Sequence, residues 1–510
     1  MQTPPWGVIL GAMCGYMTNG EAMKAGWLAL IVWTVGGCHA NAASTASADV
    51  APADVISTDT LETNGEVSSA TDWDRVVAAP DDSAAAQARS FCTYRAGDLP
   101  AETQGKSHPM GKDIPIDHIV IVMHENRSFD HFFWKLREHG HPDAEVAPAD
   151  YANPDANGQL HAPFHDKQLC FIDTAHSWNQ THTEWNLGKM DGFVLANDKS
   201  ETLPAGASPS LDDGTRALAY YEPEDIPFMY WAADEFAIAD HYHCSLLSST
   251  SPNRMFLYAA NSFGSIHNEI PAIGTAMTLF DELSARGVSW KVYAAGAPPE
   301  AMFLTMYTNF IDHFTTMDQF FADAAAGDLP SVAFVEGKDD DQVGFDPANN
   351  DEHPPGVMQV GQAALAAVTQ AVMAAPTWKS SALFITYDEH GGLWDHVPPP
   401  PACPPDATPL RKQPGDVGYG LDRLGVRVPF LAISPFAKKG YVGHHIYDHT
   451  SIVRFVQARF TLPALSGRDA NAEAPWDLFD FGKSRVDLPI VPIVPVDQAV
   501  LDACVKLLGP

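Results

Sequence analysis

Short apolar runs rich in β-branched and aromatic residues recur from residue 113 onward, separated by segments with helical patterns. Five of these runs are DHIVIVM (117–123), SWKVYAA (289–295), SVAFVE (331–336), SALFITYDEHGG (381–392) and VPFLAISP (428–435). Runs of this length are typical of strands buried on both faces, and the Ala-rich segment 361–374 has the pattern of a helix between two of them. The sequence predicts an α/β fold with a largely parallel central sheet flanked by helices on both faces.

The first of these runs ends abruptly in a polar stretch, HENRSFDH (124–131). In open α/β sheets ligands bind at the carboxyl ends of the strands, so Glu125 and Asn126 are expected in a site. The run ALFITYDEHGG repeats the pattern with Asp388 and Glu389. A carboxylate after a strand is often only a helix cap or a turn residue, but two such strand ends predict a divalent cation held by oxygen ligands.

Composition excludes several classes of protein. The 510 residues are 45% hydrophobic and 18% charged, which is typical of a folded globular chain. The 30 basic and 64 acidic residues give a formal net charge of -34. Such a charge repels nucleic acid and anionic lipid surfaces, so we expect no nucleic-acid partner.

The N-terminal residues 1–42 are expected to be a signal region, within which Met23 resembles the natural start of the signal peptide. The apolar segment 25–35 is shorter than the roughly 20 residues that span a membrane. Residues 35–38, VGGC, resemble a bacterial lipobox and predict a lipid anchor at Cys38, whereas residues 40–42 fit ordinary signal cleavage. Both alternatives predict export, as a periplasmic protein, an outer-membrane lipoprotein or a secreted protein.

Residues 43–90 are rich in Ala, Ser, Thr, Asp and Pro, a composition that predicts a disordered linker before one folded domain at 91–510. Five cysteines follow position 90, without a CxxC pair, which argues against a zinc knuckle. In an exported protein one or two disulfides are expected, and the odd number leaves at least one free thiol. The spacing does not determine the pairing of Cys92, Cys170, Cys244, Cys403 and Cys504.

Five sequence blocks between His118 and about Phe460 resemble a known family. The sequence is similar to the bacterial phosphoesterase family that contains the non-haemolytic phospholipases C and the acid phosphatase A enzymes, a group that resembles the alkaline phosphatase superfamily. The pairing of ENRSFDH with YDEHGG and DHVPPP is highly specific. The matching blocks are HENRSFDHFF (124–133), HSWNQTHTEWNLGKMDGF (176–193), ALAYYEPEDIPFMYWAADEFAIADHYHCSLLSSTSPNR (217–254), DEHPP (351–355) and TYDEHGGLWDHVPPP (386–400).

The resemblance implies an alkaline phosphatase-like phosphoesterase domain and a role for several residues. His353 would contact the transferred phosphoryl group, and His182 would do likewise or protonate the leaving group. Without the family, a buried histidine that is hydrogen-bonded for structural reasons is the favoured explanation of both residues. Residues 127–130 would pack behind the site and orient its carboxylates. The divalent metal, whose identity is open, would be held by Glu125, Asn126, Asp388 and Glu389.

The nucleophile of the family, a Ser or Thr, is not obvious in this chain. The expected position, just ahead of a Tyr-Tyr pair, is occupied by Ala217 in GTRALAYY. Thr215 and Thr250 of SSTSPNR are the candidates, although Thr215 also suits a helix cap and Thr250 a turn. A water nucleophile, or a chain without catalysis, are the remaining alternatives.

These features predict a metal-dependent, exported hydrolase of phosphate esters. A phosphomonoesterase of the acid phosphatase type is favoured over a phospholipase C acting on phospholipid head groups. The reason is that only a short tail follows the matched core, whereas the phospholipases often carry further β-rich domains. A hypothesis of a different class, motivated by Ala217, is a catalytically silent, metal-stabilised binding protein of the cell envelope.

Overall fold

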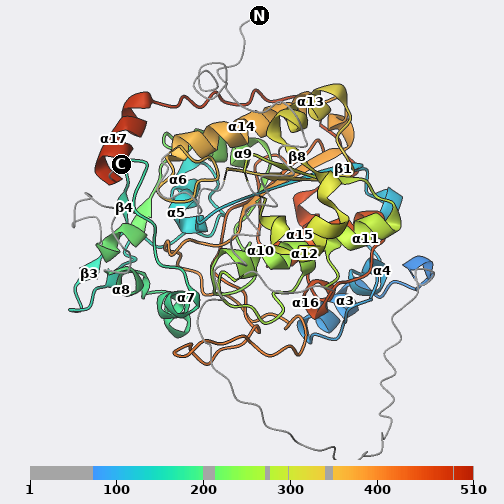
Figure 1. Ribbon diagram of the computed structural model, residues 1–510, viewed down its shortest axis with the longest axis horizontal. Coiled ribbons are helices and arrows are strands. Elements are labelled where there is room, and N and C mark those ends of the chain that lie inside the picture. Colours follow the sequence, from blue (N-terminus) through green and yellow to red (C-terminus); the bar gives the residue numbers. More distant parts are fainter. Residues whose placement is uncertain are drawn as a thin grey trace, which may run out of the picture. The chain divides into compact units, whose positions relative to one another are not determined.

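An eight-stranded sheet forms the centre of the computed structural model (Figure 1). Five of the seven strand pairs are parallel, and only the two pairs made by β11 are antiparallel. The predicted α/β fold with a largely parallel sheet is therefore confirmed. From edge to edge the strands are β12 (Tyr441–Gly443), β6 (Ala237–Ala239), β11 (Phe430–Ile433), β10 (Ser381–Tyr387), β1 (His118–His124), β9 (Val332–Glu336), β7 (Trp290–Ala294) and β8 (Phe314–Thr316).

The structure describes residues 73–198, 213–269, 276–296, 298–338, 348–485 and 487–508, which belong to one compact unit. The expected signal region, with Met23 and Cys38, lies outside the described residues. None of the helices in the described ranges combines the length and apolar character needed to cross a membrane.

Helices cover both faces of the sheet, as the sequence predicts. On one face α14 (Met358–Ala374) packs on β10 and lies between α9 (Pro227–Glu235) and α13 (Met317–Ala326). Figure 1 shows these three helices above the sheet and the second layer below it. That layer consists of α10 (Thr250–Ala259), α11 (Leu279–Arg286) and α15 (His449–Phe460).

Smaller elements gather beyond the carboxyl ends of β1 and β10, at the left of Figure 1. They are α5 (Phe129–Phe133), α6 (Leu136–His139), α7 (Trp178–Trp185), η5 (Asn186–Gly188), α8 (Phe193–Asn197) and η7 (Gly214–Leu218), with the two-stranded sheets β2 (Asn153–Pro154) with β3 (Leu160–His161) and β4 (Phe164–His165) with β5 (Ala219–Tyr220). The remaining elements are α4 (Pro100–Thr103), η4 (Gly111–Asp113), η8 (Pro299–Met302), α12 (Leu304–Asn309), η9 (Ile311–His313), η10 (Trp378–Ser380), α16 (Gly467–Ala470) and η11 (Trp476–Leu478).

The ordered domain begins earlier than the predicted boundary at residue 91. Helix α3 spans Asp82–Ser90, inside the segment expected to be a linker. Its sequence, DSAAAQARS, is rich in alanine, the residue that best favours a helix. The Arg89 side chain donates to the Thr103 carbonyl at 2.6 Å, which fixes the end of the helix to the domain. Composition alone does not show this tertiary contact.

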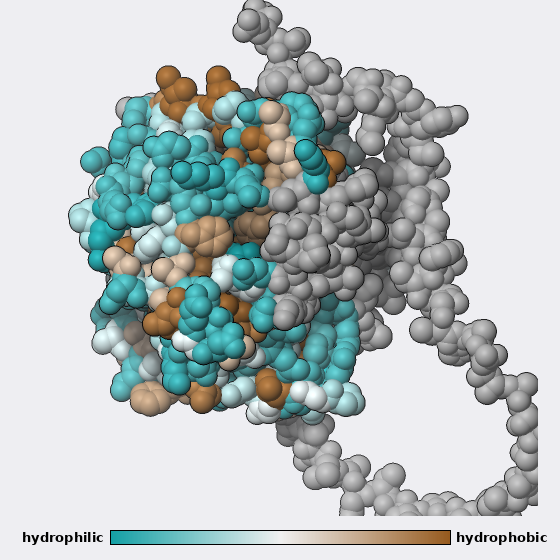
Figure 2. Space-filling view, turned by 90° about the vertical axis from the view of Figure 1, so that its left-hand side faces the viewer, coloured by the Kyte–Doolittle hydropathy of each residue, from teal (hydrophilic) through white to brown (hydrophobic). Residues whose placement is uncertain are grey.

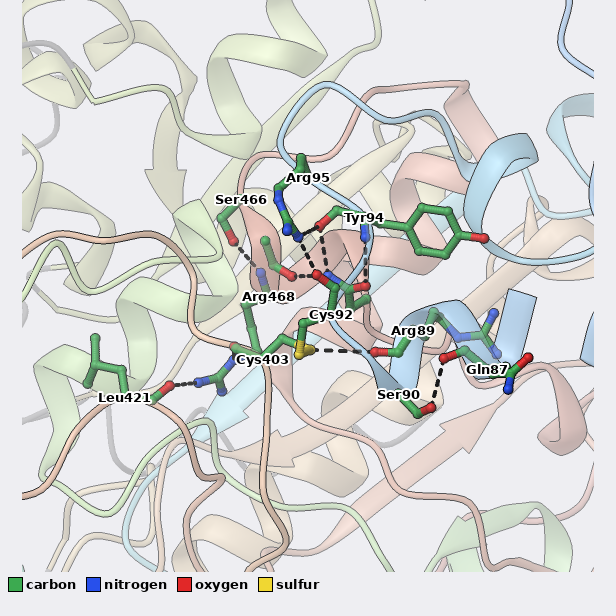
Figure 3. Close-up of a disulfide and its surroundings, with 12 residues drawn as sticks. Gln87, Arg89, Ser90, Cys92, Tyr94, Arg95, Cys403, Leu421, Ser466 and Arg468 are labelled. Atoms are coloured by element: carbon green, nitrogen blue, oxygen red, sulfur yellow. Dashed lines mark hydrogen bonds between the residues drawn. A yellow bond between two sulfur atoms is a disulfide. The ribbon is translucent and has the colours of Figure 1, made fainter. Parts of the chain in front are cut away.

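Two disulfides staple the domain, and Cys244 is free and buried. Cys92 bonds to Cys403 directly after α3, and Figure 3 shows Arg89 and Arg468 beside the bridge. Cys170 bonds to Cys504 in the C-terminal helix α17 (Gln498–Leu508). The expectation of one or two disulfides and at least one free thiol is confirmed.

Replacing Cys170 and Cys504 with Ser should release α17 from the domain. The bridge joins residues 334 positions apart, so its loss should lower the free energy of unfolding by about 2–5 kcal/mol. Limited proteolysis with mass spectrometry measures the release, and urea unfolding measures the loss of stability. The control is the Cys92→Ser, Cys403→Ser pair, which should expose α3 instead. Full protection of α17 in the first variant would contradict the tether.

Candidate active site at the carboxyl ends of two parallel strands

The two expected metal-binding pairs are brought together by the register of the central strands. β1 and β10 run parallel, and His124 lies opposite Tyr387 at their carboxyl ends. The residues that follow each strand are therefore neighbours. The backbone N–H of Asn126 donates to a carboxylate oxygen of Asp388 at 3.2 Å. All four side chains are completely buried, namely Glu125, Asn126, Asp388 and Glu389.

The side chain of Asn126 has polar atoms that point into this site without a partner. Its backbone is left-handed, with φ of 63°, which is uncommon for a residue other than glycine. Neither its Oδ1 nor its Nδ2 has a hydrogen-bond partner among the described residues. A buried amide left unpaired is costly, so the position suits an amide that binds something else.

Arg254 is the residue of this site that the sequence reasoning did not single out. It lies on α10, and its guanidinium contacts Glu125 at 2.8 Å and Asp388 at 3.2 Å. The same group contacts Glu336, at the end of β9, at 2.9 Å. Arg254 is the last residue of the block SSTSPNR, so a signal was present in the family match. Its role was not predicted because α10 is distant in the sequence from Glu125 and Asp388.

Negative charge exceeds positive charge around Arg254. Glu125, Glu336, Asp388 and Glu389 bring four carboxyl groups into the buried region. Burial, opposed in part by a neighbouring histidine, raises the pKa of Glu389 to about 7. Burial also raises the pKa of Asp388 above its usual range. A surplus of buried oxygen donors and an unpartnered amide is the composition that a divalent cation requires.

His176 is a second residue that the sequence analysis quoted without assigning a role. Its Nε2 lies 3.5 Å from a carboxylate oxygen of Glu389. Burial disfavours the charged ring, but Glu389 and Asp173 outweigh that effect and raise the pKa of His176 to about 10. His176 is the first residue of the block 176–193, and its position follows from the contact between that loop and the end of β10.

Of the two histidines expected at the phosphoryl group, His353 lies beside this cluster. Its ring is 6.5 Å from the His176 ring, centroid to centroid, and its Nε2 is 3.9 Å from Asp173. Burial raises the pKa of Asp388, and His353 is one of the groups that oppose part of that rise. The loop that carries it is held by the guanidinium of Arg127, which donates to the Glu352 carbonyl at 2.9 Å.

His182 lies in an aromatic slot instead. Its ring stacks on Tyr419 at 4.4 Å and packs on Trp178 at 4.3 Å, and its Nδ1 bonds to the Trp178 carbonyl at 2.6 Å. Burial lowers the pKa of His182 to about 4. In the described part of the chain, none of these contacts joins it to the four expected ligands.

The candidate nucleophiles occupy different surroundings. Thr250 is the first residue of α10 and is buried one turn before Arg254. Thr215 is half-buried in η7, and the cap of that element is Asp213, whose side chain accepts from the Thr215 N–H. Ala217 is completely buried in an apolar cluster with Trp394. The position at which the sequence analysis expects the nucleophile is therefore a packing position in the fold.

A separate group of possible metal ligands is already neutralised by an arginine. Among the described residues, Asp130, Asp395 and His396 form the one group of His, Cys, Asp or Glu whose ligand atoms all lie within 4.8 Å. Glu125, Asp388 and Glu389 do not form such a group, and Arg254 lies between two of them. In the Asp130 group, Arg427 contacts Asp130 at 3.2 Å and Asp395 at 2.9 Å, so its charge is balanced within the fold.

The close approach of the two strand ends depends on Gly391. A Cβ there would lie 2.5 Å from the Cβ of Asn126, and Gly391 is left-handed with φ of 60°. We expect Gly391→Ala to cost about 2–4 kcal/mol of unfolding free energy, from the clash and the backbone strain together. Gly415→Ala is the control, because Gly415 is also left-handed but has no atom within 4 Å. Thermal unfolding compares them, and equal costs would contradict the close approach.

Comparison with known proteins identifies the family of the chain. The sequence pattern of the Phosphoesterase family matches residues 116–463. Non-specific phospholipase C1 of Arabidopsis thaliana is 31% identical over 407 residues, which cover 74% of each chain. Phospholipase C B of Mycobacterium tuberculosis (strain ATCC 25618 / H37Rv) is 30% identical over 493 residues, 83% of this chain and 91% of the relative.

Among solved structures, a protein in the alkaline phosphatase superfamily from Vibrio parahaemolyticus aligns with a TM-score of 0.35 and 8% identity, over 76% of this chain and 78% of that one. The family pattern covers well over half of the sequence, and its span includes both strand ends and Arg254. The chain belongs to the phosphoesterase family.

Proposed function

We propose that this hydrolase of phosphoric ester bonds depends on a divalent cation held by Glu125, Asn126, Asp388 and Glu389. The observation that carries the proposal is the buried, unpartnered side chain of Asn126 beside a surplus of carboxylates. A cation bound there would neutralise the negative charge that develops on the phosphoryl group and lower the pKa of a nearby hydroxyl. Oxygen ligands favour Mg, Mn or Ca, while the adjacent histidines would also accept Zn or Fe.

Thr250 is the residue we propose as nucleophile. It lies on the same face of α10 as Arg254, four residues later, and Arg254 reaches Glu125 and Asp388. Thr250 is also at the N-terminus of the helix, where the unsatisfied N–H groups and the macrodipole stabilise negative charge on its oxygen. Thr215 is also near the start of a helical turn, but that turn is a short 3-10 helix, and none of its described contacts reaches Arg254, Glu125 or Asp388.

His176 and His353, which lie next to each other beside the carboxylates, would bind the phosphoryl oxygens. A positively charged His176 is favoured by Glu389 and Asp173, so it would act as a fixed cation toward the phosphate. His353 would donate a hydrogen bond or a proton to the leaving oxygen. His182, which stacks on Tyr419 and lies at an angle against Trp178, is a better candidate for shaping the wall of the site than for proton transfer.

For the substrate we propose a phosphodiester of the phospholipid head-group type. The expectation of a phosphomonoesterase rested on the short tail after the core. That reasoning loses its force because the Mycobacterium tuberculosis relative, which is named phospholipase C B, is matched over 91% of its length. A phosphomonoesterase is the second candidate.

An exported location is consistent with the two disulfides, because such bonds persist in oxidising compartments. A lipid anchor at Cys38 stays a prediction from the sequence. The hypothesis of a silent binding protein rested on Ala217, and the burial of Ala217 in an apolar cluster removes that support.

If Glu125 and Asp388 hold one cation, they act as a unit. Glu125→Ala and Asp388→Ala should each lower kcat by about 10³-fold or more, and the double variant should add little. Added Mn²⁺ should raise the Tm of the wild type and should no longer raise it in either variant. Asp117→Ala is the control, because Asp117 is exposed at the opposite end of β1. Losses that multiply in the double variant would show that the two carboxylates act separately.

Substituting each of the two candidate threonines should show which one is the nucleophile. We expect Thr250→Ala to lower kcat by about 10³-fold or more, with partial recovery in Thr250→Ser, and Thr215→Ala to stay within about threefold of wild type. Single-turnover kinetics with a chromogenic phosphodiester measures both. The reverse pattern would move the nucleophile to η7.

The substrate class is tested by the ratio of two rate constants. With the divalent metal present, kcat/KM for para-nitrophenyl phosphorylcholine should exceed that for para-nitrophenyl phosphate by about tenfold or more, a difference in transition-state binding of about 1.4 kcal/mol. A ratio below one would assign the enzyme to the phosphomonoesterases.

A further inference from the structure

The tip of η5, directly after α7, holds a leucine where neither backbone preference nor burial favours one. Leu187 has φ of 58° and ψ of 33°, between Asn186 and Gly188, which are also left-handed. Left-handed backbone is unfavourable for a leucine and easy for Asn or Gly. The Leu187 side chain is 70% exposed, so it gains little from packing within the chain. Strain of this kind at an exposed apolar residue indicates contact with something outside the chain.

Two aromatic residues lie near Leu187, one exposed and one buried. Trp185, two residues earlier, is buried at 8% exposed, and its ring is 5.5 Å from that of Tyr419, which is 38% exposed. The Tyr419 ring in turn stacks on His182. We call Trp185, Leu187 and Tyr419 the α7 ridge. Figure 2 views the side of the molecule on which α7 and α8 lie, and apolar residues stand among hydrophilic ones there.

Positive charge accompanies the α7 ridge although the chain as a whole carries a formal charge of -34. The guanidinium of Arg423 lies over the Trp185 ring at 4.8 Å. Lys412 is exposed on the loop that leads to Tyr419 and is close enough to influence the ionisation of His182. An exposed Leu and Tyr beside Arg and Lys form a combination that suits the surface of a phospholipid bilayer, with apolar groups in the acyl boundary and cations at the phosphates.

The helix that precedes Leu187 is linked to the proposed catalytic site at two points. The block that carries it begins at His176, 3.5 Å from Glu389, and runs through α7 to Leu187. The interior of α7 is fixed to the end of β10 by Glu184, whose carboxylate bonds to His390 at 2.7 Å. A surface held by the α7 ridge would therefore lie beside the strand ends that bind the phosphoryl group.

We propose that the α7 ridge docks the enzyme onto zwitterionic phospholipid bilayers, with Leu187 inserted among the lipids and Arg423 and Lys412 at the head-group phosphates. This inference rests on the proposed phospholipase function, which makes a bilayer the source of substrate. The overall negative charge disfavours anionic membranes, and the local cations favour a surface that presents phosphate groups without net charge.

The test measures flotation of the purified full chain with phosphatidylcholine vesicles. Leu187→Asn should weaken vesicle binding by about tenfold or more, which is the effect of losing one buried leucine side chain. Because Asn adopts left-handed backbone readily, its Tm should equal or exceed that of wild type, which separates lost docking from lost folding. Leu187→Phe, which keeps an apolar side chain, should bind as wild type.

The control is Ile490→Asn, which removes a side chain that is 89% exposed outside the ridge. It should leave flotation unchanged. Equal flotation of Leu187→Asn and wild type, or equal weakening in the control, would overturn the proposal. Loss of a dimer in light scattering, with flotation unchanged, would assign the ridge to a second copy of the chain and overturn docking to lipid.

Failure of the proposed function would look different. A wild type that floats with vesicles through Leu187 but hydrolyses neither lipid nor para-nitrophenyl phosphorylcholine would keep the docking surface and remove the phospholipase activity. If the enzyme is active on both, the ratio of vesicle to soluble kcat/KM should fall about tenfold in Leu187→Asn, in line with the loss of binding.

Discussion

The guanidinium of Arg254 joins four segments that are distant in the sequence. It contacts Glu125 after β1, Glu336 at the end of β9 and Asp388 after β10, and it is itself carried by α10. All these groups are buried, so removing one partner would leave an uncompensated charge, at a cost of about 3–5 kcal/mol. The arrangement of strand ends and helix therefore depends on this ion-pair cluster more than on any single apolar contact.

The same cluster links structure to chemistry. One guanidinium does not balance the charge of the neighbouring carboxylates. Burial and the nearby Glu336 also keep the pKa of Glu300 well above its usual range, because further negative charge is unfavourable in this region. His449 supports the backbone by bonding to the Asp388 carbonyl at 2.7 Å. A fixed shell with surplus negative charge is preorganised to hold a cation and, through it, a phosphate.

The sequence predicted the parts of the site that follow directly from local patterns. A buried strand that stops at a carboxylate locates Glu125 and Asp388, because the polarity change and the direction of parallel strands are both readable. Arg254 and His176 were not predicted, because their distances to these carboxylates depend on how α10 and the loop before α7 pack on the sheet. The same limit explains α3, whose helix is fixed by Arg89 and not by composition.

The central claim is that the buried carboxylates hold a divalent cation needed for turnover. The most direct measurement is elemental analysis of protein purified without added metal, combined with the activity of the same sample before and after a chelator. We expect about one divalent ion per chain, loss of turnover on its removal and recovery on its return. A sample that is free of divalent metal and fully active would contradict it.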